Sequence, residues 1–303
     1  MPVHDALGTR MKEYYEQVSK TRLVRRMPVA IRIDGKAFHT FTKWFKKPFD
    51  SILMKSMQQT MKYLCENIQG CVFGYTQSDE ITLILVDYKK LNSSAWFDYE
   101  VMKMCSIAAS MATMAFNKFF AREVDKWGFE TFGWVWHDGG TNDPEVIDFP
   151  EWKLSEIYAK AIKKGAMFDA RCFNIPKEEV TNLIYWRQLD ATRNSIQMVG
   201  QANFSHKELQ NKSCNMIQDM LHEQKGINWN DYPTVCKRGT ALIKKTITKE
   251  QPFIDDMIEY SFNNPKNNIV AQTTEWIIDT KMPILKGEDR EYVDKLINVG
   301  EDV

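Results

Sequence analysis

The stretches IRIDGKAFHTF, residues 31–41, and GYTQSDEITLIL, residues 74–85, decide the fold of this 303-residue chain. The first predicts a short buried strand that ends at Asp34, followed by a turn at Gly35 and the start of a helix. The second predicts a β-hairpin that bends at residues 77–80. Acids at the end of one strand and at the bend of a neighbouring hairpin can converge on one spot of the size of a metal site.

The composition is that of a soluble globular protein, with 44% hydrophobic and 26% charged residues. No apolar run approaches the roughly 20 residues that span a bilayer, and the N-terminus has no apolar signal core. The six cysteines form no CxxC pair and have no histidine at zinc spacing, which favours free thiols in a reducing compartment. We therefore expect a cytoplasmic protein with no membrane partner.

A net charge of zero hides an uneven distribution of charge along the chain. Residues 1–62 contain thirteen Lys or Arg and five acids, whereas residues 251–303 contain five basic residues and eleven acids. A basic N-terminal part beside a candidate acidic site suits a polyanionic ligand, such as a nucleotide or a nucleic acid. Charge alone is equally compatible with an ordinary solvated surface.

Hydrophobic periodicity and turn residues predict the other elements. Helices are expected over residues 4–26, 51–67, 96–120, 154–164 and 177–199, and strands over residues 29–34, 71–85 (the hairpin), 167–175 and 239–248. Ser205 and Glu208 form a capping box that predicts one more helix start. Residues 127–152 predict a long surface loop, which is favoured over a catalytic pair at His137 and Asp138. The acidic C-terminal region predicts a short helix and loop.

This order of elements predicts an α+β fold of the ferredoxin-like βαββαβ type, with an antiparallel sheet, helices on one face and an α-rich C-terminal part. We expect residues 1–150 to form the catalytic core, with a long insertion at about 127–152. Residues 151–303 are expected to supply the returning strand and the C-terminal helices, and to pack with the core as one unit.

The acids Asp34, Asp79 and Glu80 are the candidate catalytic residues. Mg²⁺ prefers carboxylate and carbonyl oxygens and keeps water or phosphate in its other positions. Two such ions about 4 Å apart stabilise both the attacking and the leaving oxygen of a phosphoryl displacement. The competing interpretation is that these are ordinary turn acids. Their combination with Gly35 and the basic loop at residues 43–48 favours the metal.

The backbone after Asp34 is a candidate anion site. Gly35 allows the backbone to approach an anion closely, and the amides of residues 36–39 open a helix, where they are expected to hold phosphate oxygens. The GxxxxGK[ST] motif of a P-loop does not occur in the sequence.

These motifs resemble those of the tRNA-His guanylyltransferase family and its relatives, which extend RNA 5′ ends in the 3′-to-5′ direction. The resemblance rests on RIDGKAFHTF, on KPFD at residues 47–50 and on YTQSDEITLIL. It continues through KMCSIAASMAT (103–113), FDARCFNIP (168–176) and YWRQLDATRNSI (185–196). It covers roughly residues 5–125 and 165–245 and implies a polymerase-like palm fold.

The resemblance also implies roles for individual residues. Asp34 and Asp79 would ligate two Mg²⁺ ions, with the Gly35 carbonyl joining one of them and Glu80 supporting the pair. The implied nucleotide-binding residues are Asp34, Gly35, Lys36, Ala37, Phe38, His39, Ser78 and Asp79, and the implied phosphate-neutralising residues are Lys47 and Lys103.

The implied reaction consists of two nucleotidyl transfers. ATP or GTP activates the RNA 5′ phosphate, and the 3′-hydroxyl of an incoming nucleoside triphosphate then attacks that end. The implied partners are tRNA, nucleoside triphosphates and further copies of the chain in a homotetramer.

Two positions depart from the family pattern. Glu100 stands where the family usually has an arginine, three residues before Lys103. Residues 192–195 read TRNS, where eukaryotic members have HINN, a run tied to recognition of tRNA-His. The chain therefore looks more like the guanylyltransferase-like branch, which repairs truncated tRNA 5′ ends by templated addition, than like an enzyme restricted to G₋₁ addition.

Two other functions remain open. A nucleotidyl cyclase, or another enzyme of small nucleotides, would keep the metal acids but would need no RNA surface. The WRQ segment and the basic N-terminal part argue against it. A non-catalytic RNA-binding protein could keep the palm shape, and Glu100 is the main support for that alternative.

Overall fold

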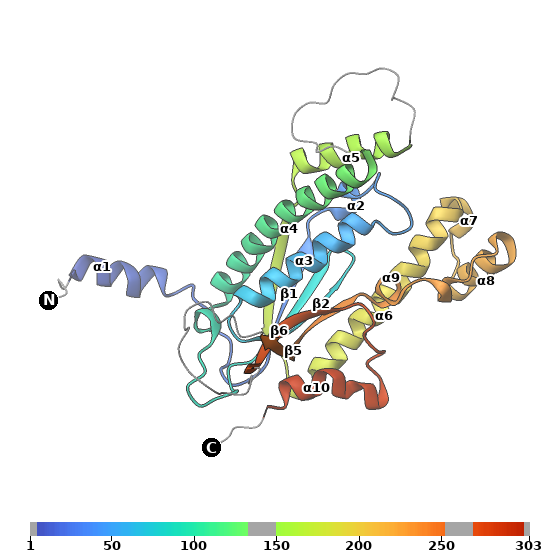
Figure 1. Ribbon diagram of the computed structural model, residues 1–303. Helices are drawn as coiled ribbons and strands as arrows, with labels where there is room; N and C mark the ends of the chain where they lie inside the picture. The colour runs from blue at the N-terminus through green and yellow to red at the C-terminus, as the bar shows by residue number, and fades with distance from the viewer. Residues whose placement is uncertain (1–4, 133–149, 252–268, 300–303) are drawn as a thin grey trace, which may run out of the picture.

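The computed structural model describes residues 5–132, 150–251 and 269–299. Its centre is an antiparallel sheet of six strands in the order β4-β1-β3-β2-β5-β6 (Figure 1). The strands are β1 (Val29–Gly35), β2 (Cys71–Gln77), β3 (Glu80–Leu85), β4 (Phe168–Asn174), β5 (Thr240–Gln251) and β6 (Ile269–Asp279).

The predicted βαββαβ unit is present and places the two motif stretches side by side. Its elements follow in the order β1, α3 (Ser51–Asn67), β2, β3, α4 (Val101–Phe132) and β4. The short helix α2 (Phe38–Phe41) lies between β1 and α3. The β2–β3 hairpin turns at Ser78 and Asp79, next to the end of β1. The predictions for β1, for α3 and for the hairpin are therefore confirmed.

Strand alternation gives β1 two different faces. Ile31 and Ile33 are fully buried in the core cluster that also contains residues of α3 and α4. The residues that alternate with them, Ala30, Arg32 and Asp34, point to the opposite face. There Ala30 belongs to the cluster formed with α6 (Lys177–Asn203) and α10 (Glu291–Ile297). The helices of the βαββαβ unit thus cover one face, as predicted, and C-terminal helices cover the other.

The C-terminal part is rich in helices, as expected. α5 (Pro150–Lys164) packs on α4, whereas α8 (Cys214–Lys225) and α9 (Thr234–Arg238) pack against α6. The short α7 (His206–Leu209) begins at the capping box that Ser205 and Glu208 predict. Figure 1 shows α7, α8 and α9 grouped around the second half of α6.

The predicted N-terminal helix over residues 4–26 is wrong in its second half. α1 (Ala6–Met11) continues through one wider turn (Lys12–Glu16) and then ends. Leu23 donates its N–H to the Tyr99 carbonyl, so the chain here is extended and bonded to the segment before α4. Figure 1 shows α1 standing away from the body, which explains why the apolar residues expected to be buried are exposed: Met11, Tyr14, Tyr15 and Val18.

Two further elements differ from the prediction. α4 runs to Phe132 and α5 begins at Pro150, so helix occupies both ends of the predicted loop at 127–152. His137 and Asp138 lie outside the described residues. The strand β6 replaces the expected helix and loop as far as Asp279, because it pairs along its whole length with β5. Its β-branched residues, as in IVAQTTEWII, were a signal for a strand.

All six cysteines are free thiols. Among the described residues, no helix is both long and apolar enough to cross a bilayer.

Candidate active site

Three acids lie side by side at one end of the sheet. The strand register places Asp34 of β1 opposite Glu80 of β3 on one side and opposite Asp169 of β4 on the other. A fourth acid, Asp79, directly precedes Glu80 in the hairpin turn. The Asp79 carbonyl accepts a hydrogen bond from the Gly35 N–H at 3.1 Å. The structure therefore brings together the acids of the two motif stretches, as predicted. Like charges at directly opposite positions are unfavourable unless they are compensated.

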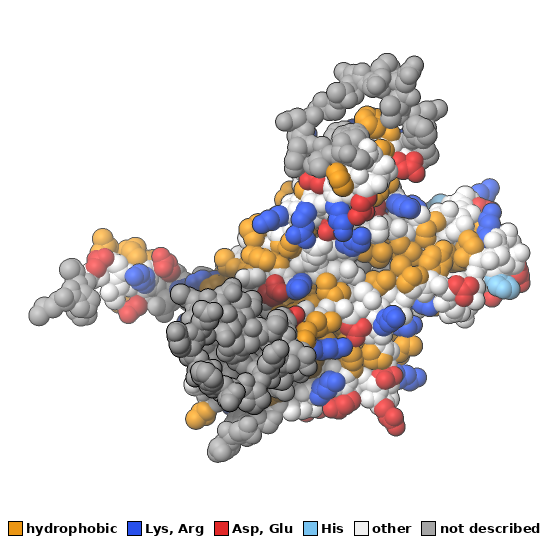
Figure 2. Space-filling view, in the orientation of Figure 1, with side chains coloured by type: hydrophobic (Ala, Val, Ile, Leu, Met, Phe, Trp, Pro, Cys, Tyr) orange, Lys and Arg blue, Asp and Glu red, His pale blue; other side chains and the backbone are white. Residues whose placement is uncertain are grey.

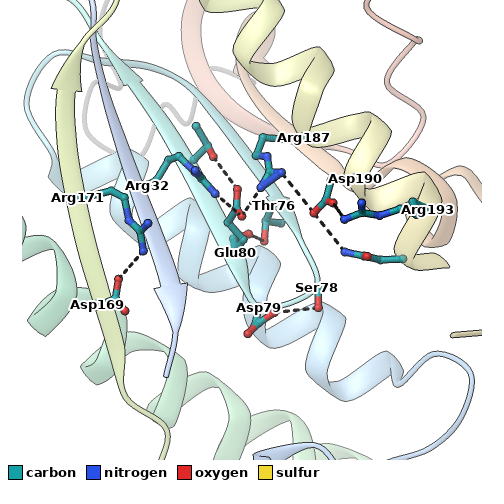
Figure 3. A network of polar contacts seen from close by, with 12 residues as sticks. Arg32, Thr76, Ser78, Asp79, Glu80, Asp169, Arg171, Arg187, Asp190 and Arg193 are labelled. Carbon is teal, nitrogen blue, oxygen red and sulfur yellow. Dashed lines mark hydrogen bonds and ion pairs between the residues drawn. The ribbon is translucent and has the colours of Figure 1, made fainter. Parts of the chain in front are cut away.

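Arginines compensate the two outer acids (Figure 3). One oxygen of Glu80 accepts hydrogen bonds from Arg32 at 2.8 Å and from Arg187 of α6 at 2.9 Å. Glu80 and Arg187 are both buried, so this is an ion pair within the core. Asp169 pairs with Arg171 at 3.3 Å in a much more exposed position. The structure thus gives Glu80 a charged partner already and makes it a supporting residue.

Asp34 and Asp79 are left without such compensation. Within the parts of the chain that the structure describes, neither carboxylate is found in an ion pair. Asp79 accepts a hydrogen bond from the Ser78 hydroxyl at 3.0 Å. Burial is the main cause that raises the pKa of Asp34, and the charges of Glu80 and Asp169 raise it further, while the charges of Arg171 and Arg32 oppose the increase. Burial likewise raises the pKa of Asp79, with smaller contributions from Asp34 and Glu80, while the Ser78 hydrogen bond opposes the increase.

This donor set fits Mg²⁺. A divalent cation between Asp34 and Asp79 would offset the burial and the neighbouring negative charges that raise the two pKa values. Among the described residues, no three His, Cys, Asp or Glu side chains form a metal cage. Mg²⁺ is commonly held by one or two carboxylates, with substrate phosphates and water completing its shell. Two carboxylates and the Gly35 carbonyl therefore match this kind of site.

A cleft of about 390 Å³ opens beside these acids. Ser78 and Asp79 line it from the hairpin, and Gly35 lines it from the end of β1. Lys46 and Lys47 line it from the basic loop. The residues of the α2 start that line it are Ala37, Phe38 and His39. The cleft thus joins the acids with cationic side chains and backbone amides, as binding of a triphosphate requires.

The amides after Gly35 are not all free. The Lys36 N–H donates to the Met167 carbonyl at 2.9 Å, which corrects the expectation that this amide holds phosphate. Ala37 adopts the left-handed conformation, with φ of 54°, and Phe38 begins α2 directly after it. Among the described residues, the N–H groups of Ala37, Phe38 and His39 have no carbonyl acceptor. Three amides therefore remain to face the cleft.

The basic loop is tied to the protein core through Asp50. This buried carboxylate accepts the N–H of Leu53 at 2.9 Å and thereby caps α3, and it accepts the N–H of Lys46 at 3.1 Å. It also accepts a hydrogen bond from the Tyr158 hydroxyl of α5 at 2.6 Å. Tyr158 is buried against Phe45. A helix more than one hundred residues later in the chain therefore fixes the loop that carries Lys46 and Lys47.

A second, smaller cavity of about 90 Å³ adjoins the cleft. It shares four lining residues with the cleft, Asp50, Leu53, Ser78 and Met198, and continues between α3, α6 and α9. Its other lining residues are mainly apolar, including Met54, Met57 and Val235. Figure 2 shows hydrophobic side chains gathered in this region between α3 and α9.

Lys103 does not lie with the other predicted site residues. It is in the first turn of α4, where its ammonium lies 4.9 Å from the centre of the Phe97 ring. Phe116, further along α4, contacts Phe38 at the cleft, with ring centres 5.5 Å apart. At 1.5 Å per helical residue, Lys103 is about 20 Å from that contact. Glu100 precedes Lys103, forms a backbone β-bridge with Arg22 and is not among the residues that line the cleft.

Sequence reasoning missed the residues that support the site from a distance. Arg187 and Tyr158 come from helices that follow the core motifs, and no local pattern connects them to Glu80 or to Asp50. WRQ at residues 186–188 was a signal, because an arginine flanked by a tryptophan on a predicted helix needs an acidic partner wherever that helix is buried. Asp50 had a clear signal as the residue directly before a predicted helix.

An antiparallel palm-like sheet with two uncompensated carboxylates, beside a cleft of amides and lysines, is the arrangement of a palm-type nucleotidyltransferase. A model of the tRNAHis guanylyltransferase family matches residues 8–176, which is more than half of the chain. The chain belongs to the tRNAHis guanylyltransferase family and is a nucleotidyltransferase.

Individual relatives agree with this assignment. A protein of Acanthamoeba polyphaga mimivirus is 27% identical over 274 residues, which are 86% of this chain and 84% of that protein. The tRNA(His) guanylyltransferase of Saccharomyces cerevisiae is 25% identical over 231 residues, which are 72% of this chain and 82% of that enzyme.

Solved structures share the fold along almost the whole chain. A bacterial tRNA(His) guanylyltransferase-like protein in complex with ATP gives a TM-score of 0.71 at 36% identity, covering 97% of this chain and 100% of that chain. The same type of bacterial protein in complex with GTP gives a TM-score of 0.67 at 35% identity, with the same coverage of both chains. These structures bear out the α+β palm fold.

Proposed function

We propose that this enzyme is a Mg²⁺-dependent 3′-to-5′ nucleotidyltransferase that adds nucleotides to the 5′ end of tRNA. The observation that carries the proposal is the pair Asp34 and Asp79. These are the acids of the cluster that lack a cationic partner, and Asp79 lines the cleft that Lys46 and Lys47 border. The relatives named as tRNA(His) guanylyltransferases support the tRNA substrate, and the bacterial complexes support ATP and GTP as nucleotides.

In this proposal, Asp34, Asp79 and the Gly35 carbonyl hold two Mg²⁺ ions. When bound, the ions neutralise phosphate charge and stabilise the attacking and leaving oxygens. Ser78 and the backbone from Asp34 to His39 hold the triphosphate. The amides of Ala37, Phe38 and His39 carry most of this contact, because the Lys36 amide is already bonded.

The reaction then consists of two balanced transfers. An oxygen of the RNA 5′ phosphate attacks the α-phosphate of ATP or GTP, and pyrophosphate leaves. The 3′-hydroxyl of the incoming nucleotide next attacks the activated 5′ phosphate, and the nucleoside monophosphate leaves. Lys46 and Lys47 stabilise the negative charge that develops on the phosphates. Asp50 and Tyr158 hold these lysines in place.

We further propose templated repair of truncated tRNA rather than addition restricted to G₋₁. Two of the residues 192–195, which stand where eukaryotic members have HINN, make internal hydrogen bonds. The Thr192 hydroxyl donates to the Lys237 carbonyl at 3.2 Å, and the Ser195 hydroxyl accepts a hydrogen bond from the Trp229 indole at 2.9 Å. The cavity beside them contains three methionines, which adapt to bases of different shape.

The test is to incubate 5′-monophosphorylated tRNAs that lack one or more 5′ nucleotides with ATP, labelled nucleoside triphosphates and Mg²⁺. We expect the RNA to be restored to full length in the order that the opposite strand dictates. Addition of a single G to every substrate would contradict templated repair. Cyclic products formed from free nucleotides without RNA would favour a cyclase instead. RNA binding without any product would favour a non-catalytic protein.

Replacing Lys47 by Gln is predicted to weaken nucleotide binding. Charge-assisted hydrogen bonds are worth about 1.5–3 kcal/mol, so the KM for the triphosphate should rise about 10- to 100-fold. Lys43→Gln is the matched control. Lys43 is on the same loop, but its ammonium lies 4.8 Å from the centre of the Trp44 ring and it does not line the cleft. Equal KM values for the two variants would remove Lys47 from the site.

Tyr158→Phe is predicted to loosen the basic loop while leaving its packing intact. We expect the KM for the triphosphate to rise about 3- to 10-fold, with kcat little changed, because the net contribution of a hydrogen bond is about 0.5–1.5 kcal/mol. Tyr292→Phe removes a similar hydrogen bond, 2.7 Å to Asp279, away from the site. Both variants should lose a similar amount of thermal stability. If both also leave the KM unchanged, Tyr158 has only a structural role.

We also propose a homotetramer in the cytoplasm. The exposed apolar residues of the N-terminal segment, such as Tyr14 and Val18, favour contact with another copy, and the free cysteines suit a reducing compartment. Light scattering of the purified chain would give the mass of the assembly, and a monomer at micromolar concentration would contradict the tetramer.

A further inference from the structure

The acid pair has a second polar surface on the side away from the cleft. Gly35 and α2 follow Asp34 along the chain and lead into the cleft, whereas Arg32 precedes it on the same face of β1, about 7 Å away. A phosphoryl displacement places the attacking and leaving groups on opposite sides of the reacting phosphorus. An anionic second substrate that reached the acids from the side opposite the cleft would meet Arg32.

Trp186 of α6 is the prominent aromatic group on this side. Its side chain is 51% exposed, although the residue after it is buried. The guanidinium of Arg187 lies 3.7 Å from the centre of the indole, and that of Arg32 lies 5.3 Å from it. Both guanidiniums are bonded to the same oxygen of Glu80, which is the cross-strand neighbour of Asp34. The indole is therefore an exposed ring held at a fixed position next to the acids.

Arg171 of β4 adds positive charge beside Arg32. The register places Arg171 directly opposite Arg32, and two arginines at opposite positions repel each other unless an anion lies between or above them. The side chain of Arg171 is 56% exposed and its ion pair with Asp169 is also exposed, so it can turn to a new partner at little cost. Figure 3 shows Arg171, Arg32 and Arg187 in a row across the sheet.

An exposed aromatic ring and a guanidinium side by side are suited to an RNA end. Unpaired bases stack on aromatic side chains, and arginines pair with the phosphates that connect them. We propose that Trp186 stacks on the 5′-terminal base of the RNA and that Arg171 pairs with the backbone phosphate next to it. This inference rests on the proposed function, because it assigns a place to the RNA at the same acids.

The test measures transfer of AMP from labelled ATP to a 5′-monophosphorylated RNA that lacks its first nucleotide. Trp186→Ala should raise the KM for the RNA about 10- to 100-fold and leave the KM for ATP within about two-fold, since one stacked base is worth about 1–3 kcal/mol. The Trp186→Phe variant keeps an aromatic ring, so its KM for the RNA should lie between those of the wild type and of Trp186→Ala. Leu189→Ala is the matched control, because Leu189 is also 51% exposed on the same helix.

Arg171→Gln should raise the KM for the RNA. It should also reduce the slope of the logarithm of the binding constant against the logarithm of the salt concentration by about one, which corresponds to one lost phosphate contact. Arg122→Gln is its control, because Arg122 is a similarly exposed arginine of α4, on the opposite face of the sheet. A KM for the RNA that changes equally in Arg171→Gln and Arg122→Gln would overturn the role of Arg171.

An RNA with an abasic 5′-terminal nucleotide separates stacking from any loss of structure. The wild-type enzyme should bind it about as weakly as Trp186→Ala binds the intact RNA, and the variant should bind both RNAs equally. If the wild-type enzyme binds the abasic and intact RNAs equally well, the stacking proposal is overturned. Wild-type enzyme that transfers no AMP to any RNA would instead overturn the proposed function itself, so the two failures are distinct.

Discussion

Replacing Asp79 by Asn is expected to abolish nucleotide addition and at the same time to make the protein more stable. The loss of activity should be at least about 10³-fold, because even one preorganised electrostatic group is worth about 10²–10³-fold. The gain in stability has a separate cause. Burial and the charges of Asp34 and Glu80 raise the pKa of Asp79, so its ionised form is unfavourable in the folded protein. Asn is nearly isosteric and carries no charge.

The size of this stabilisation depends on pH. Below the ordinary aspartate pKa of about 3.9, Asp79 is protonated in both the folded and the unfolded chain, and the variant and wild type should be equally stable. As the pH rises from there through the raised pKa of the folded state, the wild type loses stability and the variant does not. Above that range the difference stays constant.

Thermal unfolding in EDTA between pH 4 and pH 8 measures this difference. Adding Mg²⁺ and a triphosphate should raise the Tm of the wild type and leave that of Asp79→Asn nearly unchanged. A variant that is less stable than the wild type at pH 8 would show that Asp79 is an ordinary structural acid of the turn.

Replacing Arg187 by Met is expected to have the largest effect on folding. Arg187 is buried, pairs with Glu80 at 2.9 Å and with Asp190 at 3.4 Å, and its loss leaves the buried Glu80 with Arg32 alone. Breaking a buried ion pair from one side costs about 3–5 kcal/mol. Because Glu80 already raises the pKa of Asp34, its weaker neutralisation should also shift the acidic limb of the pH–activity profile to higher pH.

Arg193→Met is the matched control for this variant. Arg193 pairs with the same Asp190 from the same helix, but its side chain is 62% exposed. Exposed ion pairs contribute about 0–1 kcal/mol, so the free energy of unfolding should hardly change. Denaturant unfolding of the two variants gives the comparison. Equal losses would mean that the Glu80 pair contributes no more than a surface pair.

The parts of the fold that local patterns determine were predictable. The alternation in IRIDG, the helical stripe of residues 51–67 and the turn at Ser78 and Asp79 each depend on neighbouring residues only, and these elements agree with the prediction. The N-terminal segment also has a helical apolar pattern, yet its helix ends at Glu16, because no part of the described body packs on it. Periodicity predicts which face can be buried, and tertiary contact decides whether it is.

In the candidate site, too, some features follow from local patterns and others depend on tertiary contacts. The meeting of Asp34 with Asp79 follows from strand pairing, and motif reasoning located it. The compensation of Glu80 by Arg187 spans more than one hundred residues, and the distance of Lys103 from the cleft follows from the direction of α4. No spacing of residues in the sequence predicts either feature. Sequence motifs therefore located the acids, and the three-dimensional structure distinguished Glu80, which has arginine partners, from Asp34 and Asp79, which form no ion pair within the described residues.

The direction of RNA growth tests the central claim most directly. A 5′-monophosphorylated tRNA that lacks its first nucleotide, with its 3′ end blocked by periodate oxidation, is incubated with ATP, Mg²⁺ and labelled nucleoside triphosphates. The account predicts that the wild-type enzyme still lengthens this RNA at its 5′ end and that Asp34→Asn and Asp79→Asn do not. An RNA that stays at its starting length with the wild-type enzyme, or that the two variants lengthen equally well, would contradict it.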